Sequence, residues 1–216
     1  MTTLRQPADV QAGLVWLREA DPVLAGVIDE HPAFDPSAWM RGCRPSICLA
    51  RFGALVFQVI GQQISVVAAT AIFARVAERF GGRAPDPDDL AALEPAALRE
   101  LGLSRQKANT ALDLAERFRD GRLSEAELRS LPDEEAIRRL TAVKGVGPWT
   151  AKGALLIALR RPDLVRTDDV ALRHAIQARY GLHHLPDPSE VAALARRWSP
   201  YGSLASSLLL ATARSR

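Results

Sequence analysis

Apolar residues recur along this chain at the three- and four-residue spacing of helices, and no segment shows the sustained alternation of a strand. The densest apolar run lies at 47–61 and predicts a buried helix. Further helices are predicted at 9–20, 65–80, 89–92, 95–100, 104–119, 124–130, 133–142 and 149–159, and another begins at Val170. The pattern predicts an all-α fold made of many short helices.

Polar residues at the helix starts support these boundaries. Ser65 and Ser104 stand immediately before apolar-periodic segments and can cap them through their hydroxyl groups. Ser124 is followed three residues later by Glu127, a spacing typical of a capping box. Gly102 stands where one helix ends and Ser104 begins the next, as expected of a glycine that closes a helix.

The stretch 140–169 holds the residues that favour anion binding. Gly145-Val146-Gly147 separates two predicted helices, and Pro148 takes the first position of the second helix. Two glycines one residue apart allow positive φ angles, so the turn can direct several backbone N–H groups outward. Such a helix start binds phosphate. An acidic turn, Asp168-Asp169, follows before the next helix.

The net charge of +3 is small, but the charges are unevenly distributed. Region 133–161 carries six cations against three acids, whereas region 83–100 carries five acids against two arginines. Positive charge therefore gathers around the glycine turn, as a partner with a phosphate backbone requires. The alternative explanation is an ordinary solvated helix face.

The composition is typical of a globular protein, with 48% hydrophobic and 25% charged residues among 216. No uncharged apolar run reaches the roughly 18 residues of a membrane span. The start MTTLRQPADV lacks the pattern of a secretory signal, so a cytoplasmic protein without membrane contact is expected. Cys43 and Cys48 are too few to hold an iron–sulfur cluster. Buried free thiols are favoured over a zinc site shared with His183-His184.

Four segments, taken in order, resemble the helix-hairpin-helix (HhH-GPD) DNA glycosylase superfamily, and most closely its 3-methyladenine DNA glycosylase II (AlkA-type) branch. They are GQQISVVAATAIFARV (61–76), LRELGLSRQKANTALDLA (98–115), LTAVKGVGPWTAKGALLIAL (140–159) with RTDDVALRHAI (166–176), and RRWSPYGSLASSLLL (196–210). The resemblance implies a two-lobed fold with the active cleft between the lobes. The expected lobes are 47–161, a helical barrel carrying the hairpin, and 1–46 joined to 162–216, carrying the catalytic aspartate. The N-terminal β domain of the AlkA-type branch is expected to be absent.

The resemblance assigns DNA-phosphate binding to residues of the glycine turn and the helix start after it. They are Lys144, Gly145, Gly147 and Thr150. In relatives, carbonyl groups of the turn also hold a monovalent cation, Na⁺ or K⁺, that bridges the protein to the same phosphate. Here those carbonyl groups would belong to Thr141, Val143 and Val146. No other cofactor is implied.

A damaged base must leave the helical stack before an enzyme can reach it. The resemblance assigns the wedge that fills the vacated space to Gln63, assisted by Ile64. It assigns catalysis to Asp169, whose carboxylate would stabilise positive charge on the sugar or orient the attacking water. Asp168 would cap the helix that begins at Val170. The alternative is that both acids serve only as caps.

Trp149 stands where strand-cutting branches of the superfamily carry a lysine that forms a Schiff base with the sugar. Monofunctional hydrolysis, which leaves an abasic site, is therefore expected. Trp149 would either pack in the core or stack on an alkylated base. The other expected base-pocket residues are Gln58, Gly153, Val170 and Leu210. AlkA-type pockets often carry aromatic residues at the last three positions, so a wider and less aromatic pocket is expected.

The resemblance implies excision of alkylated bases, chiefly 3-methyladenine-like purines, in base excision repair. The expected partner is double-stranded DNA with a damaged base, bound by a monomer at the nucleoid. Two alternatives stay open at this point. One is a helix-hairpin-helix DNA-binding protein without catalysis, and the other is a glycosylase for deaminated or oxidised bases.

Overall fold

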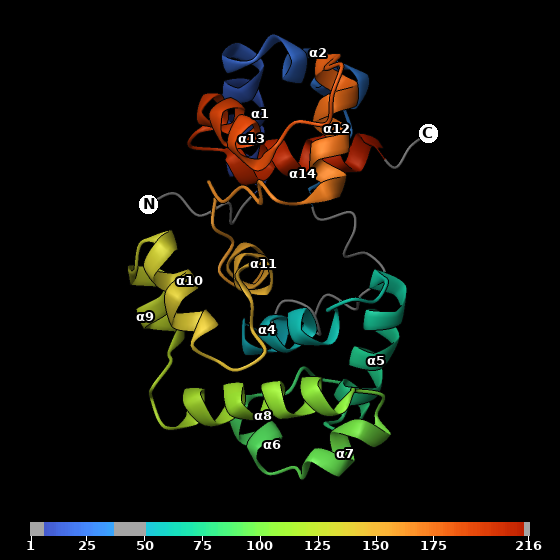
Figure 1. Cartoon of the computed structure of the whole chain (residues 1–216), viewed down its shortest axis with the longest axis vertical. Helices are drawn as coiled ribbons and strands as arrows, with labels where there is room; N and C mark the ends of the chain where they lie inside the picture. Colours follow the sequence, from blue (N-terminus) through green and yellow to red (C-terminus); the bar gives the residue numbers. More distant parts are fainter. Residues whose placement is uncertain (1–6, 37–50, 214–216) are drawn as a thin grey trace. The chain divides into compact units, whose positions relative to one another are not determined.

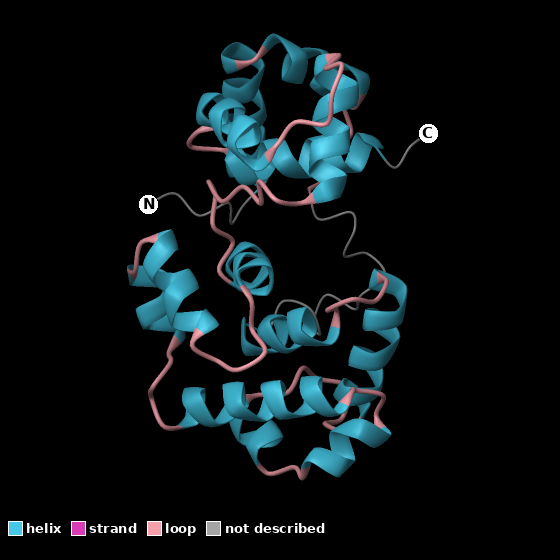
Figure 2. Cartoon of the chain, viewed as in Figure 1, coloured by secondary structure: helices cyan, strands magenta, loops and turns pink. Residues whose placement is uncertain are grey.

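The computed structural model describes residues 7–36 and 51–213, and every regular element within those ranges is a helix (Figure 1, Figure 2). The prediction of an all-α fold is therefore confirmed. Residues 51–159 form one compact unit, here called the hairpin unit, and 7–36 with 160–213 form the other, here called the terminal unit. Cys43 and Cys48 lie outside the described residues. None of the described helices is long and apolar enough to cross a membrane.

The hairpin unit is built around one buried helix. Its helices are α4 (Arg51–Ile60), α5 (Val66–Glu78), α6 (Pro87–Ala91), α7 (Pro95–Glu100), α8 (Arg105–Arg119), α9 (Glu125–Ser130), α10 (Asp133–Thr141) and α11 (Pro148–Ala158). Helix α4 is buried from Phe52 to its end and packs against α5, α8 and α11 (Figure 1). The Phe52 ring meets Phe118 of α8 edge to face, with centroids 5.3 Å apart. The apolar run at 47–61 therefore predicts this helix correctly over its described part.

Side-chain caps begin three of these helices as predicted. The hydroxyl groups of Ser65, Ser104 and Ser124 each accept an amide N–H three residues later, at 3.1 to 3.3 Å. Only the serine half of the capping box expected at Ser124 is formed. The Glu127 carboxylate binds Arg139 of α10 instead, at 2.5 Å. A long-range ion pair thus takes the place of the expected local contact.

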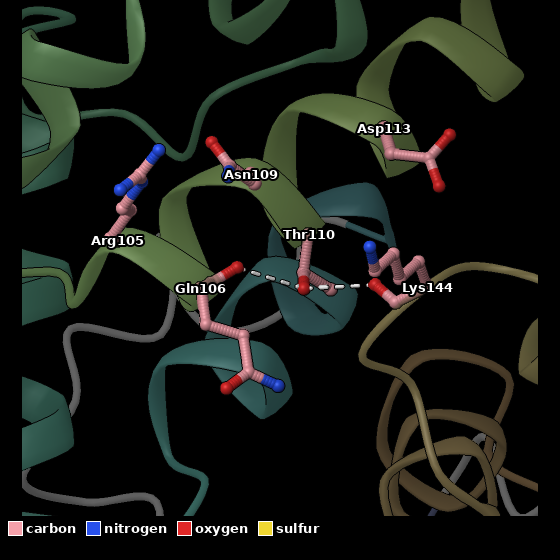
Figure 3. Close-up of a pocket in the computed structure, with 6 residues that line it drawn as sticks. All are labelled: Arg105, Gln106, Asn109, Thr110, Asp113 and Lys144. Atoms are coloured by element: carbon pink, nitrogen blue, oxygen red, sulfur yellow. Dashed lines mark hydrogen bonds between the residues drawn. The ribbon is translucent and has the colours of Figure 1, made fainter.

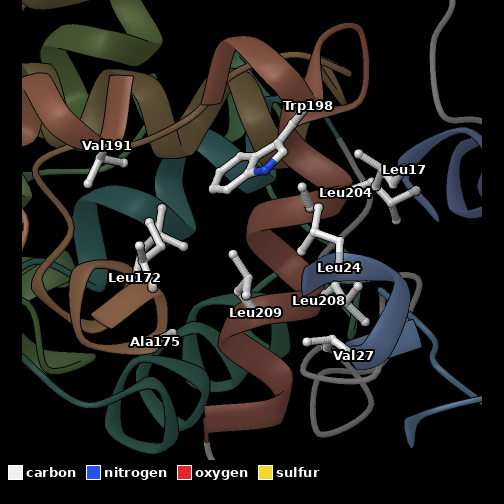
Figure 4. Packing of buried hydrophobic residues seen from close by; sticks show 12 residues of the cluster. Leu17, Leu24, Val27, Leu172, Ala175, Val191, Trp198, Leu204, Leu208 and Leu209 are labelled. Carbon is white, nitrogen blue, oxygen red and sulfur yellow. The ribbon is translucent and has the colours of Figure 1, made fainter. Parts of the chain in front are cut away.

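The terminal unit packs two segments that are distant in sequence around one tryptophan. Its helices are α1 (Pro7–Ala20), α2 (Pro22–Glu30), α12 (Val170–Tyr180), α13 (Pro188–Ala195), the 3-10 helix η2 (Arg196–Trp198) and α14 (Gly202–Ala213). Trp198 is fully buried among apolar side chains from both segments (Figure 4). Leu24 of α2 and Leu208 of α14 belong to the same cluster. The N-terminal helices are thereby part of the core that supports α12.

A buried carboxylate fixes one end of α12. Asp21 is 1% exposed and caps α2 through Oδ1, which accepts the Val23 amide at 2.9 Å. Its Oδ2 accepts the Tyr180 hydroxyl at 2.7 Å and the Trp198 indole N–H at 3.3 Å. Burial, together with the Asp21 carboxylate, raises the pKa of Tyr180 above its ordinary value. The C-terminal end of α12 is therefore anchored, while its N-terminal end carries the acidic turn.

Candidate functional site

The two glycines of the turn between α10 and α11 differ in backbone geometry. Gly145 has a φ of +92°, in the region that favours glycine, and a Cβ there would lie 2.2 Å from Thr110 Oγ1. Gly147 has a φ of −85°, and a Cβ there would meet nothing within 4 Å. Only Gly145 is thus required by the conformation of the turn. Gly147 leaves open space in front of α11.

The start of α11 offers backbone N–H groups to an anion. Gly147 is the N-cap residue and provides no side-chain cap, and Pro148 follows as the first helical residue. The N–H groups of a first helical turn have no acceptor within the helix, and the helix dipole favours negative charge there. Lys144 is exposed on the same turn, whereas Thr150 is 5% exposed. The structure therefore gathers the four predicted phosphate-binding residues at one helix start.

The three carbonyl groups assigned to a cation lie at the end of α10 and in the turn. Thr141 is the last residue of α10, where helix carbonyl groups lack helical partners and carry partial negative charge. The Val143 carbonyl accepts the Val146 amide at 3.0 Å and retains a second lone pair. Carbonyl oxygens are ligands that a potassium-sized cation accepts. The donor set therefore fits a monovalent cation in chemical type.

The predicted wedge residues lie on an exposed loop between α4 and α5. Gln63 is exposed and has a φ of +57°, which is uncommon for a residue other than glycine. Ile64 is 37% exposed, although it is apolar. The preceding residue, Gln62, is partly buried and donates from Nε2 to the Gly145 carbonyl at 2.9 Å. This contact brings the wedge loop beside the glycine turn, and no sequence pattern indicates it, because the partners are 83 positions apart.

The predicted base-pocket residues fall into exposed and buried groups. Trp149 is 41% exposed on the hairpin unit, so the alternative that it packs in the core is wrong. Val170 is 56% exposed on the terminal unit. Gln58 of α4 and Gly153 of α11 are buried, on helices that pack against each other. Leu210 is partly buried and packs against the terminal-unit core.

Asp169, rather than Asp168, caps α12. Its Oδ1 accepts two amide N–H groups from the first turn of the helix, at 3.0 and 3.1 Å. Its Oδ2 lies 2.9 Å from Nη2 of Arg166. The expectation that Asp168 caps the helix is wrong, because the extended residue directly before Val170 is Asp169. The cap and the ion pair together hold the Asp169 carboxylate in one orientation, and the cap is the role that the alternative interpretation gives to this residue.

A cavity of about 540 Å³ opens beside the turn on the hairpin unit (Figure 3). It is lined by Arg105, Gln106, Asn109, Thr110, Asp113 and Lys144. The Asp113 carboxylate is paired with Arg117 at 2.7 Å, whereas Arg105 and Lys144 bring positive charge to the lining. None of the residues assigned to the base pocket lines it. Its chemistry suits the backbone of a nucleic acid better than an alkylated base.

The sequence of this chain is similar to those of known DNA repair proteins. The family model for the HhH-GPD superfamily base excision DNA repair protein matches residues 56–200. The chain is 28% identical to a DNA-3-methyladenine glycosylase of Bacillus subtilis, over 71% of this chain and 54% of that protein. It spans about half the length of the curated relatives it matches, 54% for the first two.

Two solved structures share the fold over most of the chain. One is a DNA-3-methyladenine glycosidase from Bacillus halodurans, with a TM-score of 0.76 and 27% identity, covering 99% of this chain and 92% of that one. The other is the Schizosaccharomyces pombe 3-methyladenine DNA glycosylase in complex with abasic DNA. Its TM-score is 0.77 at 24% identity, covering 94% of this chain and 97% of that one. The predicted helix-hairpin-helix glycosylase fold is thereby confirmed.

Proposed function

Because the chain belongs to the HhH-GPD superfamily of base excision DNA repair proteins, we propose that it excises alkylated bases, chiefly 3-methyladenine-like purines, from duplex DNA. The names of similar proteins from two Bacillus species support this substrate class. The observation that carries the proposal is the Asp169 carboxylate, fixed at the start of α12 by two amides and Arg166. We expect a monomer that acts on DNA in the cytoplasm, at the nucleoid.

DNA binding is proposed to begin at the glycine turn. The amides around Gly145, Gly147 and Thr150 bind a phosphate next to the damaged nucleotide, and the exposed Lys144 ammonium adds positive charge. A Na⁺ or K⁺ ion held by the carbonyl groups at 141, 143 and 146 would supply further positive charge facing the same phosphate. Neutralising several phosphates makes the affinity depend on salt.

The wedge loop is proposed to stabilise the opened duplex. Rotating a base out of the stack costs a few kcal/mol, and the cost is least for damaged pairs. The exposed side chains of Gln63 and Ile64 are available to enter the vacated space. An amide can meet the orphaned base edge through hydrogen bonds, while the apolar neighbour excludes water from the stack.

Hydrolysis of the N-glycosidic bond is assigned to Asp169. As the bond breaks, its electron pair leaves with the base, and positive charge develops on the sugar. The carboxylate stabilises that charge or orients the water whose oxygen bonds to the anomeric carbon, and the proton lost by that water passes to the carboxylate or to solvent. An alkylated purine already carries positive charge, so it leaves as a neutral base. Trp149 has no amine for a Schiff base, and its exposed indole can stack on the cationic base.

The test is to incubate the protein with methylated duplex DNA and to measure free methylpurines by chromatography, with unmethylated duplex as the control. The proposal predicts release of free base and strand breaks that appear only after alkali. Binding without release would support the non-catalytic alternative. Release only from duplex with deaminated or oxidised bases would contradict the substrate class. Breaks without alkali, with a borohydride-trapped adduct, would contradict monofunctional hydrolysis.

A further inference from the structure

The side chain of Gln62 joins the wedge loop to the glycine turn and to the start of α11. Its Nε2 donates to the Gly145 carbonyl at 2.9 Å and to the Thr150 hydroxyl at 3.0 Å. A backbone carbonyl accepts only, so the NH₂ end of the amide must face Gly145. Gly145 belongs to the turn and Thr150 to the first turn of α11. One amide group therefore fixes the loop against the turn and against the helix start that follows it.

Lys107 of α8 also binds the wedge loop. Its ammonium group donates to the carbonyl of Ile60 at 2.8 Å and to the carbonyl of Gln62 at 2.6 Å. Ile60 ends α4, and carbonyl groups at a helix end lack helical partners and attract cations. Burial lowers the pKa of Lys107 from its ordinary value. The Lys107 ammonium group therefore binds the carbonyl groups at the end of α4 and in the wedge loop.

Helix α8 contacts the turn as well as the loop. Thr110 lies one helical turn after Lys107, and its hydroxyl is 2.9 Å from the Lys144 carbonyl. Figure 3 shows Thr110 between the Gln106 carbonyl of its own helix and Lys144 of the turn. The same hydroxyl fills the space beside Gly145 that a Cβ would need. Loop, turn and α8 therefore form a closed set of contacts within the hairpin unit.

The outer face of the wedge loop differs from this bonded inner face. Gln63 is exposed with a φ of +57°, a conformation that persists when the surrounding structure fixes it. Ile64 of the loop is 37% exposed, and Val66 and Val67, the first residues of α5, are 46% and 80% exposed. Exposed apolar side chains in such a group mark a surface that meets a partner. The loop is thus anchored from within by Gln62 and Lys107 and open on the side of Gln63.

We propose that Gln62 and Lys107 are positioning residues that set the spacing between the wedge at Gln63 and the phosphate-binding turn. The inference rests on the proposed function, because the wedge and the phosphate contact are assigned there. In an opened duplex, the vacated base position and the neighbouring phosphate lie at a fixed separation. Both contacts form together only when the protein holds the same separation in advance. The spacing therefore determines the preference for duplex with a vacated base position over intact duplex.

The experiment measures affinity for two duplexes of one sequence at fixed salt by fluorescence anisotropy. One duplex is intact and the other carries a tetrahydrofuran abasic-site analogue, so the ratio of the two affinities reports the preference. Gln62→Ala is expected to lower this ratio roughly 10- to 100-fold, the scale of a misplaced contact. Affinity for intact duplex should fall by a smaller factor than affinity for the abasic duplex, since only the abasic duplex needs the wedge and the turn to bind together. Thermal unfolding of each variant monitors folding.

Two further comparisons separate positioning from a general structural role. Gln63→Ala removes the wedge itself, so Gln62→Ala combined with Gln63→Ala should lower the ratio no further than Gln63→Ala alone. Lys107→Met removes the donors and should lower the ratio, whereas Lys107→Arg keeps a cation that can donate to both carbonyls and should restore most of it. If Gln62→Ala does not fold, the comparison of Lys107→Met with Lys107→Arg provides the same test.

Failure of the inference is distinguishable from failure of the proposed function. If Gln63→Ala lowers the ratio while Gln62→Ala and Lys107→Met leave it unchanged, the positioning role is wrong and the wedge stands. Additive losses in the double variant would also overturn the positioning role. A wild-type protein that binds both duplexes equally would contradict the proposed function, and the inference would fall with it.

Discussion

The glycine turn and the acidic turn are held in place by different kinds of contact. The turn is fixed by partners 34, 83 and 88 positions away in the chain, through Thr110 and Gln62. The Asp169 carboxylate is fixed by amides two and three positions away and by Arg166, three positions before it. The geometry proposed to bind DNA is therefore a property of the folded unit, whereas the geometry of the carboxylate proposed to react is local. Changes to packing should disturb binding more readily than chemistry.

The largest expected effect lies at the acidic turn. Asp169→Asn should lower the single-turnover rate of base release roughly 10²- to 10⁴-fold, because the charge that stabilises the sugar is lost. Asparagine can keep the cap, but the ion pair with Arg166 is lost, so the thermal midpoint should also fall and the rate is measured below it. Asp168→Asn is the matched control, and its rate should stay within about twofold at this exposed position. Equal rates for wild type and Asp169→Asn would show that the locally fixed carboxylate is only a cap.

The second largest effect is expected at the glycine turn, where substitutions of Gly145 and Gly147 are compared. Gly145→Ala should lower the free energy of unfolding by roughly 1–3 kcal/mol, because of its positive φ and the clash with Thr110. Gly147→Ala should change it by less than about 0.5 kcal/mol. The added methyl group of Gly147→Ala would stand in the open space where a phosphate is proposed to bind, so it should weaken DNA binding instead. Chemical denaturation and anisotropy measure the two quantities, and similar destabilisation by both variants would contradict the assignment.

The third effect tests whether the acidic turn is independent of the far end of its helix. Tyr180→Phe removes the hydroxyl that Asp21 accepts and should cost about 1 kcal/mol of stability. The base-release rate should stay within about twofold, since Asp169 lies about 16 Å away along α12. A large loss of rate at unchanged DNA affinity would show that the acidic turn is not locally determined.

The same variant should change the response to alkaline pH. The pKa of Tyr180 is raised in the fold, so the neutral phenol is the form that stabilises the protein. Its contribution is complete below the ordinary value of 10.0 and is lost as pH rises above that value. Wild type should therefore lose stability more steeply above pH 10.0 than Tyr180→Phe. Denaturation curves at a series of alkaline pH values measure this, and identical slopes would contradict it.

The smallest expected effect is that of a single exposed cation. Lys144→Ala should reduce the slope of log affinity against log salt by about 0.9, the value for one phosphate contact. Arg99→Ala, an exposed position on α7, is the control and should leave the slope unchanged. Equal slopes for Lys144→Ala and wild type would remove Lys144 from the DNA contact and leave the backbone amides to hold the phosphate.

The sequence predicts correctly those features of the fold that depend on residues close together in the chain. Helix α7 has the predicted bounds, Pro95–Glu100, and the serines at 65, 104 and 124 cap their helices as expected. The buried helix α4 is predicted because nearly every position of it is apolar. Glu127 departs from the expectation because Arg139, a residue of another helix, competes for its carboxylate.

The candidate site likewise has features that the sequence predicts and features that depend on long-range contacts. The glycine turn and the acidic pair are visible in the sequence, but two adjacent aspartates suit a cap equally well. Only the backbone decides that Asp169 takes that position, with a φ of −71° and a ψ of 113°. The bonds of Gln62 and Lys107 span 45 to 88 positions, so no local pattern contains them. Long-range hydrogen bonds are fixed by packing, which a single sequence does not display.

The separation of binding from chemistry is tested most directly by measuring two quantities on each of two variants, Gly147→Ala and Asp169→Asn. The quantities are the affinity for methylated duplex and the rate of base release at saturating duplex. We expect a crossed result, in which Gly147→Ala loses affinity and keeps the saturated rate, while Asp169→Asn keeps affinity and loses the rate. Parallel losses of affinity and saturated rate in both variants would contradict it.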